Sequence, residues 1–411
     1  MKRKAKLLSG LLIIMTATIS CKSGSKDSPA EGTDFLADCP VVGQYVQTEN
    51  GKILSCEETL LTDTVRFPLS YFAEEIEIIK LDNREEALVG ATEITVSDNH
   101  ILAHSGYPPT AFKLFDRKGT YISDVGAVGE GPGEYRTVYD AQIDESNQRI
   151  YLMPWQSDKL LVFDMQGKAL DPIPLGIRCP KAKIKVDAAK GTITVFSLPW
   201  PQLPAFVWTQ DMTGKHIQEI APGHLEVTPN FNTEICCYSN VKNVSDFSLY
   251  CMDPTRADSL YQYDASNNRL QPVFTFHHKT ADPVPWHGYC EWPDHFVGNF
   301  SGPPVVRQHE HGTTMTPGET FHYIISKKTG KGAYLKMYND YFGNLEIPYP
   351  SYAFSKGYFI RNMEPGVLLA DIEKALKNTD ISDEMRKKLT ELQGSINEDD
   401  NNYILIARLK K

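Results

Sequence analysis

The sequence predicts an all-β fold: a six-bladed β-propeller of four-stranded antiparallel blades, with a short helical insertion near the C-terminus. Its first support is a repeat, in which an apolar run ends in an acid and then turns at Gly or Asn. The four copies are residues 114–119, 162–167, 208–214 and 260–267. The turn residues Gly119, Gly167 and Gly214 are 48 and 47 residues apart, and Asn267 follows 53 residues later. A repeat of this length is typical of propeller blades.

The second support is the alternation of apolar and polar residues between these turns. Residues 93–97 alternate, turn at Asp98-Asn99 and return over 100–103, and two further strands flank Gly119. Alternation bounded by Gly, Asn and Asp predicts antiparallel strands. The later blades are expected at 141–173, 184–220, 247–276, 321–337 and 355–409. Residues 41–80 also have strand character, and we expect them to include the strand that closes the ring.

One region of the sequence has a helical pattern. Residues 367–376 and 385–396 carry apolar side chains at spacings of three and four. Ser382, followed by two acids, has the features of an N-cap and a first helical turn. We therefore expect a helical insertion at about 366–396, inside the last blade.

The N-terminus predicts export and a lipid anchor. A basic start is followed by 13 mostly apolar residues, 7–19; this is too short for a membrane span, which needs about 20 residues, but suits a secretory signal. Thr18-Ile19-Ser20-Cys21 resembles a bacterial lipobox, with Cys21 as the lipidated residue. The alternative is an ordinary signal peptide with a chance cysteine. We expect a signal peptide at 1–20, a polar tether at 21–33 and a single propeller domain at 34–411. The membrane is then a partner through the lipid, in the cell envelope and at the outer membrane, facing the periplasm or the surface.

The charge of the chain argues against nucleic acid as a partner. The formal net charge is −10, and residues 1–20 contain four basic residues and no acid, so their removal leaves −14. Binding to phosphates requires basic patches. An anionic lipid surface is disfavoured for the same reason.

Seven cysteines follow Cys21, an odd number that cannot pair completely within the chain. They are Cys39, Cys56, Cys179, Cys236, Cys237, Cys251 and Cys290. An exported chain can form disulfides, and Cys39 with Cys56 could clip an N-terminal hairpin, but spacing does not assign pairs. We expect buried packing residues or one or two disulfides, with metal or redox chemistry as the alternative.

A glycine-rich element at 125–135 lies between the first two blades. Its glycines permit positive φ and close backbone approach, and Pro132 stiffens it. It is not a phosphate loop, because no Gly-Lys-Ser/Thr follows. It is expected to be a tight crossover between blades, or alternatively a loop at the channel mouth that presents Glu134 and Arg136 to a ligand.

Taken with the Phe-Asp-x-x-Gly run at 115–119 and the C-terminal run 401–410, this element gives the chain a family likeness. The chain resembles six-bladed β-propeller lipoproteins of Gram-negative anaerobes, which are similar to the propeller of TolB and mostly have no assigned function. The resemblance covers residues 60–411 and departs most at 223–320. It implies a propeller and an envelope location, and it supplies no catalytic residues.

Seven of the eleven histidines lie between residues 277 and 322. We expect 281–318 to be a long, irregular loop, the kind of segment that often carries function. Imidazoles and carboxylates can bind a divalent metal, with His309 and His311 as the candidate ligands. Packing histidines are the alternative, and no cofactor is expected otherwise. Trp286, Tyr289 and Trp292 could instead form a carbohydrate pocket, and a further candidate contact is Arg307.

These observations support a binding protein more than an enzyme. The first hypothesis is a lipid-anchored, non-enzymatic propeller that binds a glycan, a peptide or an envelope protein. The alternative is a propeller hydrolase or lyase with a metal or histidine site in 277–322. A subunit of an envelope assembly is a third reading, which the likeness to TolB suggests.

Overall fold

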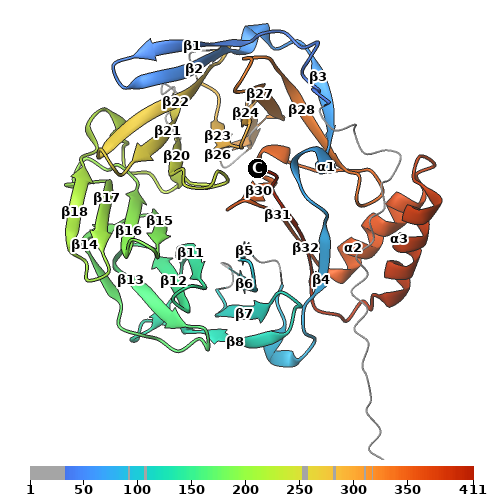
Figure 1. Cartoon of the computed structure of the whole chain (residues 1–411), viewed down its shortest axis with the longest axis horizontal. Helices are drawn as coiled ribbons and strands as arrows, with labels where there is room; N and C mark the ends of the chain where they lie inside the picture. The colour runs from blue at the N-terminus through green and yellow to red at the C-terminus, as the bar shows by residue number, and fades with distance from the viewer. Residues whose placement is uncertain are drawn as a thin grey trace, which may run out of the picture.

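The computed structural model is a ring of six β-sheets around a central channel (Figure 1). It describes residues 33–90, 93–105, 109–251, 258–280, 284–309, 312–316 and 318–411. The predicted six-bladed propeller is therefore confirmed. Residues 1–20, most of the tether, Cys21 and His311 lie outside the described residues.

The blades follow one another along the chain, each with its first strand nearest the channel. From the inside outward, the first three are β5 (Glu93–Val96), β6 (His100–His104), β7 (Phe112–Asp116) and β8 (Tyr121–Val125); β11 (Val138–Asp144), β12 (Arg149–Pro154), β13 (Ser157–Asp164) and β14 (Ile173–Cys179); and β15 (Ala182–Asp187), β16 (Thr192–Ser197), β17 (Val207–Asp211) and β18 (His216–Ile220).

The last three blades also recruit strands from the N-terminal region. They are β19 (Glu234–Cys236), β20 (Asp246–Tyr250), β21 (Ser259–Asp264) and β22 (Arg269–His277), extended by β2 (Gly51–Glu57) and β1 (Gly43–Thr48); β23 (His287–Glu291), β24 (His295–Ser301), β27 (Thr320–Ser326) and β28 (Gly332–Asn339), with β29 (Leu345–Glu346) and β3 (Thr64–Pro68); and β30 (Phe354–Ser355), β31 (Tyr358–Met363), β32 (Tyr403–Arg408) and β4 (Glu77–Lys80).

The shorter elements lie in the connections. They are β9 (Ala127–Val128), β10 (Glu134–Tyr135), β25 (Val305–His309), β26 (Gly312–Thr316), α1 (Leu69–Phe72), α2 (Pro365–Leu376), α3 (Asp383–Ser395), and the 3₁₀ turns η1 (Glu58–Leu60), η2 (Glu85–Ala87), η3 (Gly223–Leu225) and η4 (Pro350–Tyr352).

The N-terminal strands close the ring from the outside. β4 pairs antiparallel with β32, with Ile79 opposite Ile404. β3 pairs parallel with β28, and β2 pairs parallel with β22. The segment from β1 to β4 thus extends three successive blades, as Figure 1 shows. The expectation that 41–80 contains the closing strand is confirmed.

The repeated acid and glycine have a common structural role. Oδ1 of Asp164 accepts the backbone N–H groups of Gln166 (2.9 Å) and Lys168 (2.9 Å), which fixes the turn. Gly167 takes a φ of 76°, and a Cβ there would lie 1.7 Å from the carbonyl oxygen of Asp124 in the preceding blade. The turn therefore needs glycine both for its φ and for its close approach to the neighbouring blade.

The fourth repeat differs from the prediction by one residue. Asp264 pairs with Arg269, so its loop has one residue more than the loops that turn at glycine. Asn268, not Asn267, takes the positive φ of 50°. Asn267 instead donates from Nδ2 to Oδ2 of Asp264 at 2.6 Å.

The hydrophobic core is divided among the interfaces between blades. One cluster joins the closing blade to the first, through Ile79, Ile404 and Phe115. Clusters of the same kind lie at each of the five remaining interfaces between neighbouring blades. A seventh lies outside the last blade, beneath α2 and α3, and includes Leu368 and Leu389. Each blade therefore depends on both of its neighbours for burial.

The predicted helical insertion is also confirmed. α2 and α3 lie on the outside of the ring, next to the closing blade (Figure 1). Ser382 caps α3, because its side chain accepts the N–H of Met385 at 3.1 Å. Within the described residues, no helix has the length and apolar character that a membrane crossing would require.

The prediction of an irregular loop at 281–318 is wrong. The described part of this segment contains β23, β24, β25 and β26. Residues 295–300 of β24 are all buried. A strand buried on both faces shows no alternation of apolar and polar residues, so the sequence signal for it is lost.

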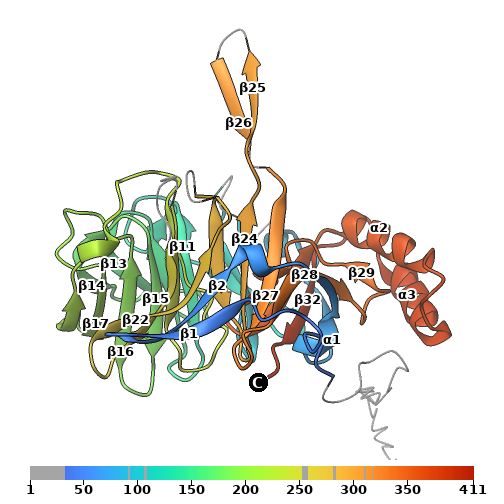
Figure 2. The same ribbon diagram turned by 90° about the horizontal axis from the view of Figure 1, so that it is seen from above.

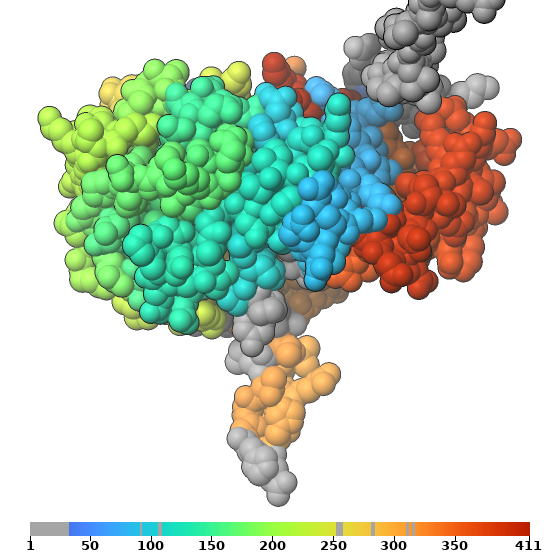
Figure 3. Space-filling model, turned by 90° about the horizontal axis from the view of Figure 1, so that it is seen from below, coloured from blue at the N-terminus to red at the C-terminus, as the bar shows by residue number. Residues whose placement is uncertain are grey.

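The strands β25 and β26, called the arm below, project from one face of the ring (Figures 2 and 3). Among the described strands they pair with each other and with no other, and every residue of β25 is exposed. The face that carries them is called the arm face. Figure 2 places the C-terminus on the opposite side.

The cysteines in the described part of the chain are free thiols. Cys39, Cys56, Cys179 and Cys290 are buried, which agrees with the packing interpretation. The suggested clip between Cys39 and Cys56 does not form. Burial raises the pKa of Cys56 and of Cys179 to about 12, so both are neutral packing groups at pH 7.

Candidate functional site

The glycine-rich element forms the crossover from the first blade to the second. Oε2 of Glu134 accepts the N–H of Gly131 at 2.8 Å, which folds the loop onto itself. Arg136 pairs with Glu130 at 3.2 Å, and both side chains are largely exposed. This geometry agrees with the crossover interpretation. The proposed ligand role of Glu134 and Arg136 stays a prediction.

The three aromatic candidates do not meet in one pocket. Tyr289 and Trp292 are only 3% and 1% exposed, and Trp286 is half-buried. Tyr289 packs edge-on against Phe274 with ring centroids 5.4 Å apart. Trp292 lies in the core next to Phe72, at 4.7 Å. Neither buried ring offers a face to a sugar from solvent.

The remaining candidates lie on the arm. Arg307 and His309 belong to the exposed strand β25, and His309 Nε2 lies 2.8 Å from Oγ1 of Thr314. Among the described residues, no group of three or more His, Cys, Asp or Glu side chains could hold a metal ion. A metal site that includes His311 stays a prediction.

The other histidines of the 277–322 segment are mostly packing residues. Burial lowers the pKa of His278 to about 3, and that of His295 and of His322 to about 4. Burial also lowers the pKa of His287. These imidazoles are neutral at pH 7, and they are distributed through the core of the fifth blade rather than over one surface.

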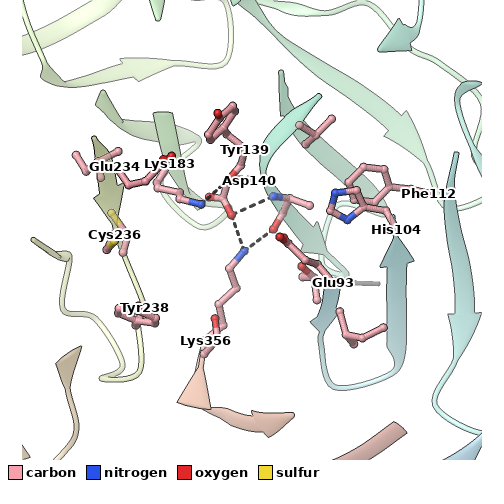
Figure 4. A pocket seen from close by; sticks show the side chains of 17 residues that line it. Glu93, His104, Phe112, Tyr139, Asp140, Lys183, Glu234, Cys236, Tyr238 and Lys356 are labelled. Atoms are coloured by element: carbon pink, nitrogen blue, oxygen red, sulfur yellow. Dashed lines mark hydrogen bonds and ion pairs between the residues drawn. The ribbon is translucent and has the colours of Figure 1, made fainter. Parts of the chain in front are cut away.

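The structure instead presents a cavity at the centre of the ring, of about 270 Å³. The inner strands of four blades line it, together with Lys356 of the closing blade (Figure 4). The first residues of β5 and β11 line this cavity. A second space, of about 750 Å³, is lined by the opposite ends of the same strands and by residues 408–411, so it lies on the side of the C-terminus. The smaller cavity therefore opens on the arm face.

Lys356 forms the floor of this cavity. It follows β30 in a two-residue turn with Gly357, and their φ values of 53° and 80° are those of a type I′ hairpin turn. Its Nζ donates to Oδ1 of Asp140 at 2.9 Å and to the carbonyl oxygen of Ala141. The side chain thus joins the closing blade to the second blade across the channel.

The same turn also binds the fourth blade. The N–H of Lys356 donates to the carbonyl oxygen of Tyr238 at 2.7 Å, and the N–H of Gly357 donates to Oδ1 of Asn240 at 3.1 Å. The amide of Asn240 donates in return to the carbonyl oxygen of Phe354 at 3.1 Å. One turn therefore connects three alternate blades beneath the cavity.

Asp140 is the carboxylate at the centre of the site. Figure 4 shows Lys183 and Lys356 pointing toward it from two sides. Its Oδ2 accepts the N–H of Ile184 at 2.9 Å, and Nζ of Lys183 donates to the carbonyl oxygen of Tyr139 at 2.5 Å. Burial is the largest single influence on the pKa of Lys183 and lowers it, but Asp140, Cys236, Cys237 and Glu93 together outweigh burial and leave the pKa raised. Lys183 therefore stays protonated at pH 7, and Nζ of each lysine is held by an oxygen acceptor.

The rim of the cavity carries aromatic and acidic side chains. His104 stacks on Phe112 with ring centroids 3.9 Å apart, and burial lowers the pKa of His104. The exposed Glu93 lies opposite His104 on the neighbouring strand. Burial also raises the pKa of Cys236 to about 11, so its thiol is protonated at pH 7 and is a weak nucleophile.

These residues had only weak sequence signals. Lys356-Gly357 between two short strands is a recognisable turn, but nothing in the sequence connects it to Asp140, 216 residues away. Glu93 and Lys183 occupy ordinary alternating strand positions. The convergence of inner strands from separate blades on one point is a property of the closed ring.

The comparisons with known proteins agree with the architecture. Residues 52–408 match a family model described as a domain of unknown function, DUF4934. No curated protein matches the chain. A candidate exported protein of Bacteroides fragilis NCTC 9343 has a similar structure, with a TM-score of 0.55 and 16% identity over 85% of this chain and 100% of that chain. A member of the DUF4221 family from Bacteroides vulgatus ATCC 8482 gives a TM-score of 0.42 and 13% identity, over 82% and 97% of the two chains.

Proposed function

Because this chain belongs to the DUF4934 family, whose function is unknown, we propose a function from its own geometry: a non-enzymatic binding propeller. Its ligand, a glycan, a peptide or an envelope protein, binds at the arm face. The observation that carries the proposal is the central cavity of about 270 Å³, to which five blades contribute side chains. Concave sites where several elements converge are the usual binding sites of such folds.

The chemistry of the cavity supports binding rather than catalysis. The charged groups at its centre are engaged with one another, since Nζ of Lys356 donates to Oδ1 of Asp140 and Asp140 also helps to raise the pKa of Lys183. Nucleophilic catalysis would need an activated group, whereas the thiol of Cys236 has a raised pKa. Glu93 at the rim is exposed and its side chain makes no hydrogen bond or ion pair with the described residues, so its carboxylate can accept hydrogen bonds from a polar ligand.

The proposal includes an envelope address. A lipid on Cys21 anchors the protein at the outer membrane, with residues 22–33 as the tether. The description of the structural relative from Bacteroides fragilis as a candidate exported protein supports the export step of this proposal. Replacing Cys21 with Ser should move the protein from the membrane fraction to the soluble fraction. Unchanged membrane association would contradict the lipid anchor.

The test of binding is thermal unfolding of the purified protein with panels of oligosaccharides, peptides and envelope proteins. A ligand that binds only the folded state, at 100 times its dissociation constant, should stabilise it by about 2.7 kcal/mol. Glu93→Gln and Lys356→Met should weaken this shift. Lys190→Met should not, because that side chain is exposed and pairs with Asp187, away from the cavity lining.

Two outcomes would overturn the proposal. One is a ligand whose stabilising effect is the same in the cavity variants and in the unchanged protein. The other is steady turnover of a bound ligand, which would show that the site is catalytic.

A further inference from the structure

A second concave site lies between the second and third blades. It is a groove of about 500 Å³, lined by the outer end of β14 and by the loop from β16 to β17. Ser157, which begins β13 beside this groove, pairs with Cys179 at the end of β14. The start of β13 lies at the same end of its blade as the first residues of β11 and β15, which is the end at the arm face. The groove therefore opens on the arm face.

The strand β14 is distorted where it forms the groove. β13 and β14 pair at Lys159–Pro174 and again at Ser157–Cys179. A single residue of β13 thus faces four residues of β14, 175–178. Gly176, in this bulge, has a φ of 69°. Bulges re-aim side chains, and this one places Arg178 at the groove.

Within the part of the chain that the structure describes, the side chain of Arg178 has no partner, unlike that of most arginines there. Across the described residues, Arg178 and Arg307 are the two arginines whose side chains make no hydrogen bond, ion pair or ring contact. The partnered ones are Arg66, Arg84, Arg117, Arg136, Arg149, Arg269, Arg361, Arg386 and Arg408. The neighbouring Asp158 on β13 forms no ion pair with Arg178 in the described structure. On a chain with a net charge of −10, an unpaired guanidinium in a groove is a binding group for an anion.

The other wall of the groove is aromatic and held in place. Trp200 is half-buried and packs partly against the core of the third and fourth blades. Its loop is fixed by hydrogen bonds from Trp200 N to the carbonyl oxygen of Leu198 (2.8 Å) and from Leu203 N to that of Trp200 (3.0 Å). A fixed indole offers an apolar face on which a sugar ring can pack.

Two amide side chains complete the lining, from Gln156 and Gln202. Gln156 is held at a φ of 48°, and its N–H donates to the carbonyl oxygen of Pro180 at 3.2 Å. Amides, an aromatic face and a guanidinium match the hydroxyls, the ring and the carboxylate of an acidic sugar.

We propose that the groove formed by Arg178, Trp200, Gln156 and Gln202 binds a carboxylated sugar, such as a uronate, in an acidic glycan. The carboxylate pairs with the Arg178 guanidinium through two parallel hydrogen bonds, and the sugar ring packs on Trp200. This inference goes beyond the proposed function, because it assigns a second binding site, separate from the central cavity, on the same face of the ring.

The experiment is isothermal titration of the full protein with an oligogalacturonate of four residues and with the same oligosaccharide after reduction of its carboxyl groups. Arg178→Gln should weaken binding of the acidic form at least tenfold, and Arg178→Lys should weaken it several-fold because the paired geometry is lost. The reduced oligosaccharide should bind the unchanged protein at least tenfold more weakly than the acidic form. Arg149→Gln makes the same charge change at the far end of the second blade and should leave affinity unaltered.

Equal affinity of Arg178→Gln and the unchanged protein, or no binding of the oligogalacturonate, would overturn the inference. Equally tight, Arg178-dependent binding of a glutamate-rich peptide would overturn the assignment to sugars. If another ligand binds and is weakened by Glu93→Gln, the proposed function stands without this groove. If none of the panels binds, the proposed function fails as well.

Discussion

Asp246 shows how a single residue can set the response of the fold to pH. It is 2% exposed at the start of β20. Its Oδ1 accepts the N–H of Ser239 at 3.1 Å, whereas Oδ2 has no hydrogen-bond partner in the described part of the chain. Burial, and next the negative charge of Glu291, raise its pKa to about 7 from an ordinary value of 3.8. Such a carboxyl is more stable protonated in the folded state.

The first prediction concerns this carboxyl. Between pH 4 and 7 the unfolded chain loses the Asp246 proton while the folded chain keeps it, so the free energy of unfolding falls as pH rises. Asp246→Asn cannot ionise, and its stability relative to the unchanged protein should therefore increase from pH 5 to pH 8, by roughly 1–3 kcal/mol. Urea unfolding at the two pH values measures this.

The control for this prediction is Asp187→Asn. A hydrogen bond from Lys190 lowers the pKa of Asp187, so this carboxylate is ionised in both states above pH 5. The effect of Asp187→Asn on the free energy of unfolding should therefore be the same at pH 5 and at pH 8. An equal effect of Asp246→Asn at both values would show that the Asp246 carboxyl does not keep its proton on folding.

At the scale of elements, the turn between the third and fourth strands docks each blade onto the one before it. The carbonyl oxygen of Gly167 accepts the N–H of Gly126 at 3.1 Å, and Gly119 makes the same contact with Asp82 at 2.8 Å. The repeat seen in the sequence is therefore the mark of a packing contact as well as of a turn.

The second prediction separates backbone strain from close approach at such a turn. Gly191 has a φ of 62° with nothing within 4 Å of a Cβ, so Gly191→Ala should cost about 1 kcal/mol, from its φ alone. Gly167→Ala adds a collision with the Asp124 carbonyl, 1.7 Å away. It should cost at least about 3 kcal/mol, since the two blades must separate. Urea unfolding of both variants gives the difference, and equal costs would rule out the docking role.

The sequence predicted those elements whose two faces differ. β14 and β15 alternate between buried and less buried residues, and their blades were located correctly. β24, buried along its first six residues, was missed together with β23, because only the buried partner strands distinguish such segments from a loop. The contact of Lys356 with Asp140 was not predictable either, since it depends on the number of blades in the ring and on which blades face each other across its centre.

At the scale of the whole molecule, the ring is closed twice. The pairing of β4 with β32 closes it at the rim, where a strand from the N-terminal region adds to the last strand of the chain. The turn at Lys356 ties alternate blades together at the channel. With a core at every interface between blades, no blade can lose its packing without exposing its neighbours. The arm is the exception, because it pairs only with itself.

The third prediction follows from this closure. Ile404 in β32 is fully buried, and Ile404→Ala should destabilise the protein by about 2–5 kcal/mol. Because every blade depends on its neighbours, the loss should shift one cooperative transition, with circular dichroism and tryptophan fluorescence following the same curve. Val306→Ala, on the arm with 52% exposure, removes a similar apolar group and should change stability by no more than about 0.5 kcal/mol. Two separate transitions in Ile404→Ala would mean that the blades unfold independently, and an equal loss in Val306→Ala would mean that the arm is packed against the ring.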